Sequence, residues 1–449
     1  MAKIVPFRGV RYNPDSVKDL SKVMAPPYDV ISPELQDDLY ARHPANVVRL
    51  ILGKTSEEDG EADNRYTRAA ADFEKWQEDG ALMRDAEPSV YLYDQEYPIE
   101  DGTVVVRKGF MALTRIEDFS SGVVKPHEKT LSGPKTDRLN LTKACGANFS
   151  PIFSLYSDPC CALESLTRKD REQSPALEVS DDDGVKHRLW RVTDPASIEK
   201  AQELLSSKPL FIADGHHRYE TALNFRNLMR EKHPGYTGKE LFNYVLMYFA
   251  NMEDQGMLIF PTHRMIFNLE AFHLESLLEA LGEHFLIDRR QIDSTDPAAR
   301  AQAREELKER GRDKHVMGLF AGDETLYFLT LKDEAVMDRF FDPSSPKVLR
   351  TLDVSILHKL ILEGLLDITP EAQEKQVNLK YVKNFDDPFD LVQCGEFQLA
   401  FLMNSTRMSE VRDVANAGEK MPQKSTYFYP KLLTGLVINK IAASETVEG

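Results

Sequence analysis

The sequence predicts an α+β protein in which a mixed sheet is flanked by helices. Strand-like apolar runs and helical stripes alternate along the 449 residues, but without the strict regularity of repeated strand-helix-strand units. The composition, 42% hydrophobic and 29% charged, is that of an ordinary globular protein, and no internal repeat or heptad pattern is present. The length corresponds to two or three domains of average size.

The elements expected in the N-terminal part follow from short patterns. Residues 47–52 are β-branched and aliphatic and end at a glycine, which predicts a strand. Apolar residues between 64 and 78 follow one helical face, and Asp79-Gly80 ends that helix. Two further strands are expected at 89–97 and 103–115, joined as a hairpin. A long polar loop then enters a helix near Pro134.

The middle of the chain contains the clearest pattern. A buried strand at 210–213 is followed by a helical stripe that runs from Tyr219 to Met229. The other expected elements, taken in chain order, are a strand at 152–156, an exposed connector or hairpin tip at 168–184, a strand at 244–251, helices at 270–282, 297–311 and 353–365, a strand at 397–403 and a helix at 405–416. We expect two domains, residues 1–255 and residues 256–449.

Charge and hydropathy exclude several classes of protein. A protein with a net charge of −17 is repelled by phosphate backbones and by anionic membranes. The charge therefore disfavours non-specific binding to nucleic acid or to such membranes. No apolar run is long enough for a signal peptide or a membrane span, so a cytoplasmic protein is expected. The four cysteines lack CxxC spacing, which favours free thiols.

The first cluster of functional groups lies between the strand and the helix of the 210–229 segment. Its sequence is Asp214-Gly215-His216-His217-Arg218. A glycine turn that opens a helix directs free amides and the positive end of the helix dipole at one point, where anions bind. Arg218 could hold phosphate bidentately, and Asp214 could act as a base or as a Mg²⁺ ligand. The alternative is that Asp214 caps the helix and the histidines are packing residues.

Two further clusters contain groups that suit phosphate. The second comprises His127, Glu128, Lys135 and Arg138, and the last two stand three residues apart on one expected helical face. It could be a phosphate clamp or a solvated loop with surface ion pairs. The third cluster is Lys424-Ser425-Thr426, which lacks the glycines of a P-loop. We expect the first domain to contain the first two clusters and the second domain to contribute the third.

These clusters, in this order, resemble the family known as domain of unknown function 1015. The stretches that carry the resemblance are Pro6-Phe7-Arg8-Gly9 with Arg11-Tyr12, Ala25 to Ile31, His127-Glu128 with Thr130, Lys135 with Asp137-Arg138, Ala213 to Tyr219, and Met421-Pro422 with Lys424-Ser425-Thr426 and Pro430-Lys431. More distantly, Asp-Gly-His-His-Arg is similar to the strand-turn-helix signature of the ParB/sulfiredoxin-like fold. That resemblance implies a ParB/sulfiredoxin-like nucleotide-binding core with large insertions.

Within that fold the sequence resembles free-serine kinases best. Sulfiredoxins have a reactive cysteine where this chain has His216, and the acidic charge disfavours the DNA-binding partition proteins. The resemblance to the kinases implies that Asp214 is the catalytic carboxylate and that His217 and Arg218 hold phosphate. Tyr28 and Asp29 belong to a matching stretch and are expected to bind substrate or phosphate.

The sequence therefore predicts phosphoryl transfer on a small polar metabolite. A nucleotide-dependent free-serine kinase and a phosphoserine phosphatase would use the same groups, with Asp214 or Glu128 deprotonating the attacking hydroxyl and His217 assisting. ATP or ADP would be the nucleotide, and Mg²⁺ would bind at Asp214 or Glu128. The alternative is a non-catalytic nucleotide-binding regulator or scaffold. The expected partner is a small metabolite, with neither nucleic acid nor membrane, and a homodimer is left open.

Overall fold

The computed structural model describes all residues except 100–101, 129–131, 443 and 448–449. The chain divides into two compact units. The first unit contains residues 1–126, 130–258 and 430–449, and the second contains residues 127–129 and 259–429. The last twenty residues thus return to the first unit, and three residues near position 128 belong to the second. Among the described residues, no helix is both long and apolar enough to cross a bilayer.

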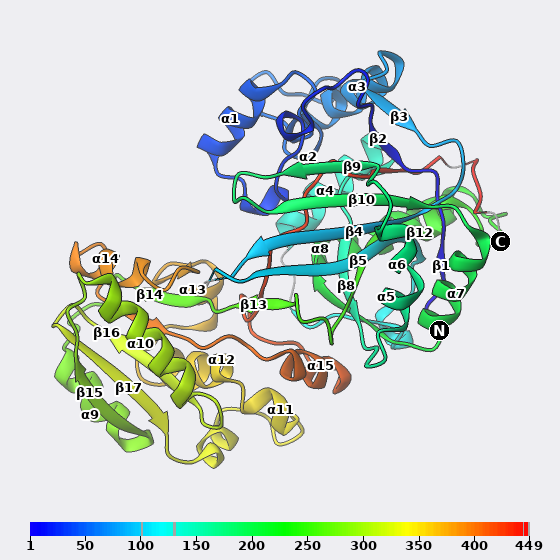
Figure 1. Cartoon of the computed structure of the whole chain (residues 1–449). Helices are drawn as coiled ribbons and strands as arrows, with labels where there is room; N and C mark the ends of the chain where they lie inside the picture. Colours follow the sequence, from blue (N-terminus) through cyan, green and yellow to red (C-terminus); the bar gives the residue numbers. More distant parts are fainter. Residues whose placement is uncertain (100–101, 129–131, 443, 448–449) are drawn as a thin grey trace. The chain divides into compact units, whose positions relative to one another are not determined.

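A mixed sheet forms the centre of the first unit (Figure 1). Within the described part of the chain its strands, in spatial order, are β6 (Val124–Lys125), β11 (Leu210–Asp214), β8 (Ile152–Tyr156), β12 (Tyr244–Asn251), β5 (Val104–Arg115), β4 (Val90–Pro98), β10 (Lys186–Val192) and β9 (Leu177–Ser180), and β1 (Ile4–Val5) also pairs with β5. The β6–β11 and β8–β12 pairs are parallel and the others are antiparallel. The predicted α+β class with a mixed sheet is confirmed.

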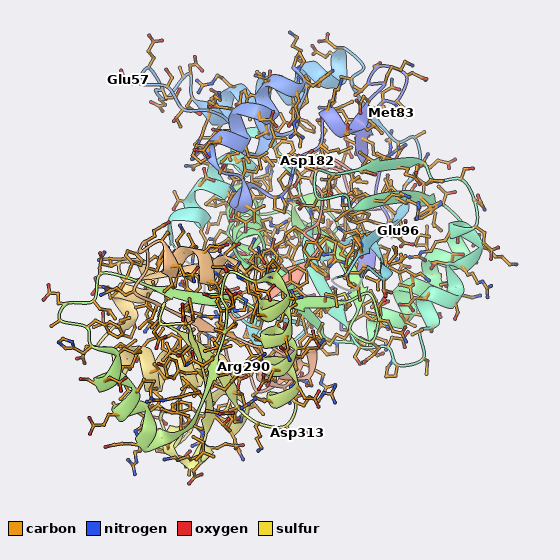
Figure 2. All side chains as sticks on the ribbon, turned by 60° about the vertical axis from the view of Figure 1, so that its left-hand side comes forward. Glu57, Met83, Glu96, Asp182, Arg290 and Asp313 are labelled. Carbon is orange, nitrogen blue, oxygen red and sulfur yellow. The ribbon has the colours of Figure 1, made fainter. Side chains whose placement is uncertain are left out.

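Helices cover this sheet and carry the functional segments. The helices of the first unit are α1 (Pro33–Arg42), α2 (Val48–Ile51), α3 (Arg65–Glu78), α4 (Ser132–Cys145), α5 (Ala162–Leu166), α6 (Arg168–Arg171), α7 (Pro195–Ser206) and α8 (His216–Lys232). Apolar residues of α7 and α8 pack with those of the strands in one core cluster. Smaller pairings join β2 (Val10–Tyr12) to β3 (Leu82–Arg84) and β7 (Ala147–Asn148) to β21 (Asn439–Lys440). Glu57, Met83 and Asp182 lie on the exposed surface of this unit (Figure 2).

The second unit contains an antiparallel sheet with a core on each face. Its strands, in spatial order, are β15 (Phe285–Gln291), β17 (Thr325–Leu331), β16 (Val316–Phe320), β19 (Leu399–Leu402), β14 (His263–Ile266) and β18 (Leu379–Val382). The helices are α9 (Leu274–His284), α10 (Pro297–Arg310), α11 (Lys347–Arg350), α12 (Asp353–Ile356), α13 (Pro370–Glu374), α14 (Asp387–Gln393) and α15 (Met408–Asn416). Two further short strands, β13 (Leu258–Phe260) and β20 (Tyr427–Tyr429), pair with each other. In the sequence, β13 precedes β14 and β20 follows α15. The two cores involve different strand residues and different helices.

Most sequence-predicted elements are confirmed within a few residues, including the β4–β5 hairpin, α3, β8, β11, α8 and β12. The strand predicted at 47–52 is wrong, because α2 occupies Val48–Ile51. The Asn46 side-chain oxygen accepts a hydrogen bond from the Val48 N–H at 2.9 Å, which starts a helical turn, and Val48, Leu50 and Ile51 are all buried. A short apolar run that is buried on every side does not distinguish a strand from a helix.

Two other segments differ in detail from the prediction. The segment 168–184, expected to be an exposed connector or a hairpin tip, contains α6 and β9, and its end forms the tip of the hairpin between β9 and β10. The helix expected at 353–365 begins as α12 and continues as a π-helix over Leu357–Glu363. Wide π turns change which residues share a face, and such turns occur frequently at functional sites.

Candidate functional site

The strand-turn-helix segment of the first unit has the predicted local structure. β11 ends at Asp214, Gly215 has a φ of +94°, and α8 begins at His216. The backbone angle favours glycine, and an added Cβ at Gly215 would lie 2.9 Å from Arg218 Nε, so that the guanidinium would have to move. The first turn of a helix has amides without intrahelical acceptors, and α8 extends over seventeen residues to Lys232. The turn therefore presents amides beside the Asp214 and Arg218 side chains.

Asp214 is at the centre of an ion-pair network. Its Oδ1 accepts a hydrogen bond from the Gly215 N–H at 2.8 Å, and its Oδ2 lies 2.9 Å from Lys431 Nζ. Arg218 Nη2 lies 3.7 Å from the same oxygen. The N-cap residue of α8 is Gly215, so Asp214 does not act as the helix cap. The carboxylate instead joins the end of β11 to two cations.

The surroundings of Asp214 keep its side chain ionised. Burial alone would raise the pKa of Asp214, but the charges of Lys431 and Arg218, the Lys431 hydrogen bond and the charge of His216 together lower that pKa well below its usual value. A carboxylate of this kind accepts a proton only reluctantly, so it is a weak general base. It is well suited to orient a hydroxyl group and to hold cations in place.

Lys431 was not among the site residues predicted from the sequence. Its backbone oxygen accepts a hydrogen bond from Gln95 Nε2 at 2.8 Å, and the preceding Pro430 oxygen accepts one from Arg107 Nη2 at 2.6 Å. Arg107 is fully buried, and its guanidinium lies 4.6 Å from the centroid of the Phe153 ring. The central strands therefore fix the segment that delivers the Lys431 ammonium to Asp214. In the sequence, Pro430-Lys431 is only one of the stretches that carry the resemblance, and this was the signal that could have identified Lys431.

Arg138 and Arg218 border one cavity of the first unit. This cavity has a volume of about 50 Å³, which is room for a few water-sized atoms. The residues around it are Tyr28, Ile51, Arg138, Leu141, Thr142, Ala147, Asn148, Phe149, Ser150, Ile152, Arg218, Thr221, Ala222 and Val245. Among the described residues that line it, the two guanidiniums are the only charged groups. The structure thus brings together the arginines of the first two predicted clusters, although they are far apart in the sequence.

Tyr28 is surrounded by charged residues of the site. The Arg138 guanidinium lies 4.0 Å from the centroid of the Tyr28 ring. Burial raises the pKa of Tyr28, and the nearby charges act in opposite directions: Arg138 and Arg218 lower the pKa, whereas Asp29 and Asp214 raise it. Tyr28 is half-buried and Asp29 is exposed. Tyr28 therefore lies close enough to both arginines and to both carboxylates for their charges to act on its hydroxyl.

Other residues near this site hold the helices together. Lys135 Nζ of α4 pairs with Glu220 of α8 at 2.9 Å. Asp137 forms ion pairs with Arg65 and Arg138 and accepts a hydrogen bond from the Tyr66 hydroxyl at 2.8 Å. Arg138 also donates a 2.7 Å hydrogen bond to the Ile51 oxygen. These contacts connect α4 with both α3 and α8.

The two histidines of the first turn of α8 differ in exposure. His216 is buried and its charge lowers the pKa of Asp214, whereas His217 is half-buried. The catalytic role predicted for His217 and the phosphate-binding role predicted for His216 stay predictions.

The remaining predicted site residues belong to the second unit. His127 Nε2 lies 3.0 Å from Thr426 Oγ1, and Glu128 Oε1 accepts a hydrogen bond from the Lys424 N–H at 3.2 Å. The buried Ser425 donates its hydroxyl proton to the Pro422 oxygen at 2.6 Å. The second and third clusters of the sequence are thus partly one structural group. His127 and Glu128 join the Lys424–Thr426 segment, whereas Arg138 borders a cavity with Arg218 and Lys135 pairs with Glu220 of α8.

The sequence predicts that Mg²⁺ binds at Asp214 or Glu128, and the groups around Asp214 bear on this prediction. Among the residues that the structure describes, no group of three or more His, Cys, Asp or Glu side chains is arranged to hold a metal ion. Lys431 Nζ, 2.9 Å from Oδ2, lies where a cation bound to that oxygen would have to be. Mg²⁺ prefers octahedral oxygen ligands and usually binds protein through one or two carboxylates together with substrate phosphates. The residues present therefore do not fit Mg²⁺ on this oxygen while Lys431 holds its position.

The chain belongs to the family of proteins of unknown function designated DUF1015. The sequence model of this family matches residues 4–355, which include β11, the glycine turn and α8. The recognition made from the sequence motifs is confirmed. None of the curated proteins matches the chain.

Several solved structures are similar to parts of this chain. A conserved hypothetical protein from Pyrococcus furiosus has 14% identity and a TM-score of 0.31, and the match covers 69% of this chain and 89% of that one. A free serine kinase in complex with AMP has 13% identity and a TM-score of 0.33, with coverages of 72% and 90%. The protein SbnI from Staphylococcus aureus, truncated at its C-terminus, has 12% identity and a TM-score of 0.34, with coverages of 73% and 86%.

Proposed function

We propose that this protein transfers a phosphoryl group between a nucleotide and a small polar metabolite, with serine or phosphoserine as the metabolite. The observation that carries the proposal is the ionised Asp214 held between Lys431 and Arg218 at the start of α8. An anion-binding helix start, two cations and an oriented carboxylate are the groups that phosphoryl transfer needs. The resemblance of the Asp214–Arg218 motif to that of free-serine kinases supports the same reaction.

Each group has a role that follows from its charge. The amides at the start of α8 and the Arg218 guanidinium would bind the oxygens of the transferred phosphoryl group, and Arg138 would neutralise charge beside them. Lys431 would hold Asp214 in position and approach the developing negative charge. ATP or ADP would be the donor, and any Mg²⁺ would be bound through the nucleotide phosphates.

Asp214 would orient the acceptor hydroxyl. The hydroxyl oxygen attacks phosphorus, the bond from phosphorus to the leaving oxygen breaks, and the hydroxyl proton passes to Asp214 late in the reaction. A transition state that is loose needs little deprotonation of the nucleophile, so a carboxylate with a lowered pKa is sufficient. With water as the acceptor and phosphoserine as the donor, the same groups would serve a phosphatase, which releases serine and inorganic phosphate. His217 and Glu128 remain further candidates for proton transfer, although Glu128 Oε1 already accepts the Lys424 N–H.

Assays of phosphoryl transfer in two variants test the proposal. One variant breaks the Asp214–Lys431 ion pair, and the other breaks a different ion pair of the same unit. Lys431→Met should reduce the rate of transfer between serine and nucleotide at least tenfold, because it frees Asp214 and removes a cation from the site. The matched control is Lys208→Met, since Lys208 pairs with the buried Asp158 at 3.5 Å elsewhere in the first unit. Equal rates for the two variants would exclude Lys431 from the reaction.

A nucleotide-binding regulator is the second candidate. It is favoured by the completeness of the ion pairing around Asp214, because a fully compensated carboxylate can be purely structural. On this alternative the wild-type protein would bind ATP or ADP in a calorimetric titration, and Arg218→Lys would weaken that binding. No phosphate would be transferred to or from serine with any donor.

A further inference from the structure

Arg264 is a buried guanidinium in the second unit, in the strand β14. Only 1% of this residue is exposed. Its Nη1 donates to the Thr262 oxygen and its Nη2 donates to the Lys424 oxygen at 3.2 Å. The guanidinium also lies 5.4 Å from the centroid of the Tyr381 ring. Two neutral carbonyl groups and one aromatic ring are thus its partners.

Arg264 makes no ion pair with a carboxylate among the residues that the structure describes. A buried cation without a counter-charge is expensive, because neutral acceptors do not replace the hydration that the charge loses. Burial accordingly lowers the pKa of Arg264 to about 10. The buried Arg300 of the same unit, 8% exposed, differs from Arg264 because it pairs with Asp390.

Other buried polar atoms occur on the same side of the sheet. Side chains alternate along a strand, so Arg264 and Ile266 share a face, and Ile266 belongs to the core cluster that includes Leu357 and Leu360. His358 stands between those leucines in the π-helix, and Ser355 precedes it by three residues. Arg264 Nε, His358 Nε2 and Ser355 Oγ are all buried and have no hydrogen-bond partner.

The electrostatics place His358 close to Arg264. Burial lowers the pKa of His358 to about 3, and the positive charge of Arg264 contributes to that shift. His358 is therefore neutral, although a hydrogen bond with Gln373 raises its pKa against these two effects. The Nε2 atom has no partner, and in the tautomer that carries the proton on Nε2 this atom can donate to a ligand. A guanidinium, a neutral imidazole and a hydroxyl together form a set of donors with positive charge.

We propose that the second unit binds a small oxyanion, a phosphate or carboxylate group, at Arg264 with Ser355 and His358 as further donors. One oxygen of the anion would replace the Lys424 carbonyl on the Arg264 guanidinium, because a negatively charged oxygen attracts a guanidinium more strongly than a neutral carbonyl does and can bind it in a bidentate way. Lys424 is exposed and has a φ of +56°, an unfavourable angle for a lysine, so its turn can relax when the carbonyl is released. This site is separate from the transfer site proposed for the first unit.

Thermal unfolding of the full-length protein in inorganic phosphate, in acetate and in sodium chloride at equal ionic strength tests the proposal. We expect phosphate or acetate to raise the Tm of the second unit in the wild type, with chloride giving no comparable shift, and the better anion identifies the ligand class. In Arg264→Met this shift should be absent, while the Tm without anion should equal or exceed that of the wild type, because an uncompensated buried charge has been removed. Arg300→Met is the matched control, and it should keep the anion-dependent shift.

Two further variants keep the test decisive. Arg218→Met disables the anion-binding groups of the first unit, so a shift that survives in this variant cannot come from the proposed transfer site. Ser355→Ala should weaken the phosphate or acetate effect several-fold, and it remains informative even where Arg264→Met does not fold. The proposal is overturned by a wild type that responds to no oxyanion, or by a shift that disappears in Arg218→Met and persists in Arg264→Met. Arg264 would then be a structural clamp on the Lys424 carbonyl.

Discussion

Two sites of this protein, one in each unit, differ in how their buried charges are compensated. In the first unit the charges at the site are paired: Asp214 with Lys431 and Arg218, and Arg138 with Asp137. In the second unit Arg264 has only neutral partners, and burial lowers the pKa of both His263 and His358 to about 3. Paired charges hold their groups in a fixed geometry, which suits chemistry on a substrate. A buried charge without a counter-charge has an uncompensated desolvation cost, which a ligand of opposite charge can offset.

The substitution with the largest expected effect is Asp214→Asn in the first unit. It keeps the shape of the side chain and removes the charge that orients the acceptor, so transfer should fall by about two to four orders of magnitude. Nucleotide affinity should stay constant or improve, because a negative charge is removed from a phosphate site. Steady-state kinetics and calorimetric titration measure the two quantities separately. Asp158→Asn, which alters a second lysine-paired aspartate of the unit, should leave transfer within a few-fold of wild type.

Acid should weaken the second unit before the first. A histidine with a folded pKa of about 3 and an unfolded pKa near 6.5 binds its proton first in the unfolded state. Its contribution to stability is complete above pH 6.5 and is lost as the pH falls toward 3, by up to about 1.4 kcal/mol per pH unit for each histidine. The lowered pKa of Asp214 gives a contribution that is lost only below about pH 3.9, its unfolded value.

The two units can be followed separately during this titration. Both tryptophans of the sequence, Trp76 and Trp190, lie in the first unit, so their fluorescence reports on that unit, and hydrogen exchange reports on peptides of the second. His315 acts in the opposite direction, because the Asp353 hydrogen bond raises its pKa and its stabilisation is lost as the pH rises. His358→Leu should flatten the acid dependence of the second unit. Simultaneous loss of both units, unchanged by this variant, would contradict the contrast between them.

Gly215→Ala should affect both folding and binding in the first unit. A φ of +94° costs an alanine about 1–2 kcal/mol, and the new Cβ displaces the Arg218 guanidinium. We expect nucleotide affinity to fall roughly tenfold, which corresponds to about 1.4 kcal/mol. Gly122→Ala is the control, because Gly122 has a φ of +68° with no atom within 4 Å of an added Cβ. That variant should lose stability alone; equal nucleotide affinity in the two variants would mean that the Arg218 position does not matter.

The smallest effect is expected for Lys135→Met. The Lys135–Glu220 pair is partly exposed, with 29% and 19% of the two side chains accessible, and pairs of this kind contribute about 0–1 kcal/mol. Unfolding by urea should therefore show a change below about 1 kcal/mol, with nucleotide affinity altered less than threefold. A large loss of affinity would instead show that Lys135 leaves Glu220 to bind phosphate, as the sequence predicted.

The sequence predicted those parts of the molecule whose signals are local. The glycine turn and the 3.6-residue periodicity after it identified β11, Gly215 and α8, because the backbone angle and the buried helix face are both properties of neighbouring residues. The strand prediction for residues 47–52 was wrong for a local reason as well. Their uniform burial removes the periodicity that distinguishes a helix from a strand.

The partners of the site residues could not be predicted in the same way. Lys431 reaches Asp214 across 217 positions of sequence, and its position depends on Gln95 and Arg107 in the central strands. His127 and Glu128 follow β6 directly but join Lys424–Thr426 in the second unit. Arg264 carries no motif, and only the fold shows that its charge is buried without a carboxylate. Long-range pairing is set by topology, which residue spacing does not reveal.

The most direct test of the account is phosphorus NMR of the wild-type protein with serine and ATP, with serine and ADP, and with phosphoserine and ADP. The central claim is that the Asp214–Lys431–Arg218 network performs phosphoryl transfer. It predicts a new phosphomonoester signal, or loss of the phosphoserine signal, that appears at the same rate in Lys208→Met and is at least tenfold slower in Lys431→Met. Nucleotide binding with no change in any phosphorus signal, for all three mixtures, would contradict it.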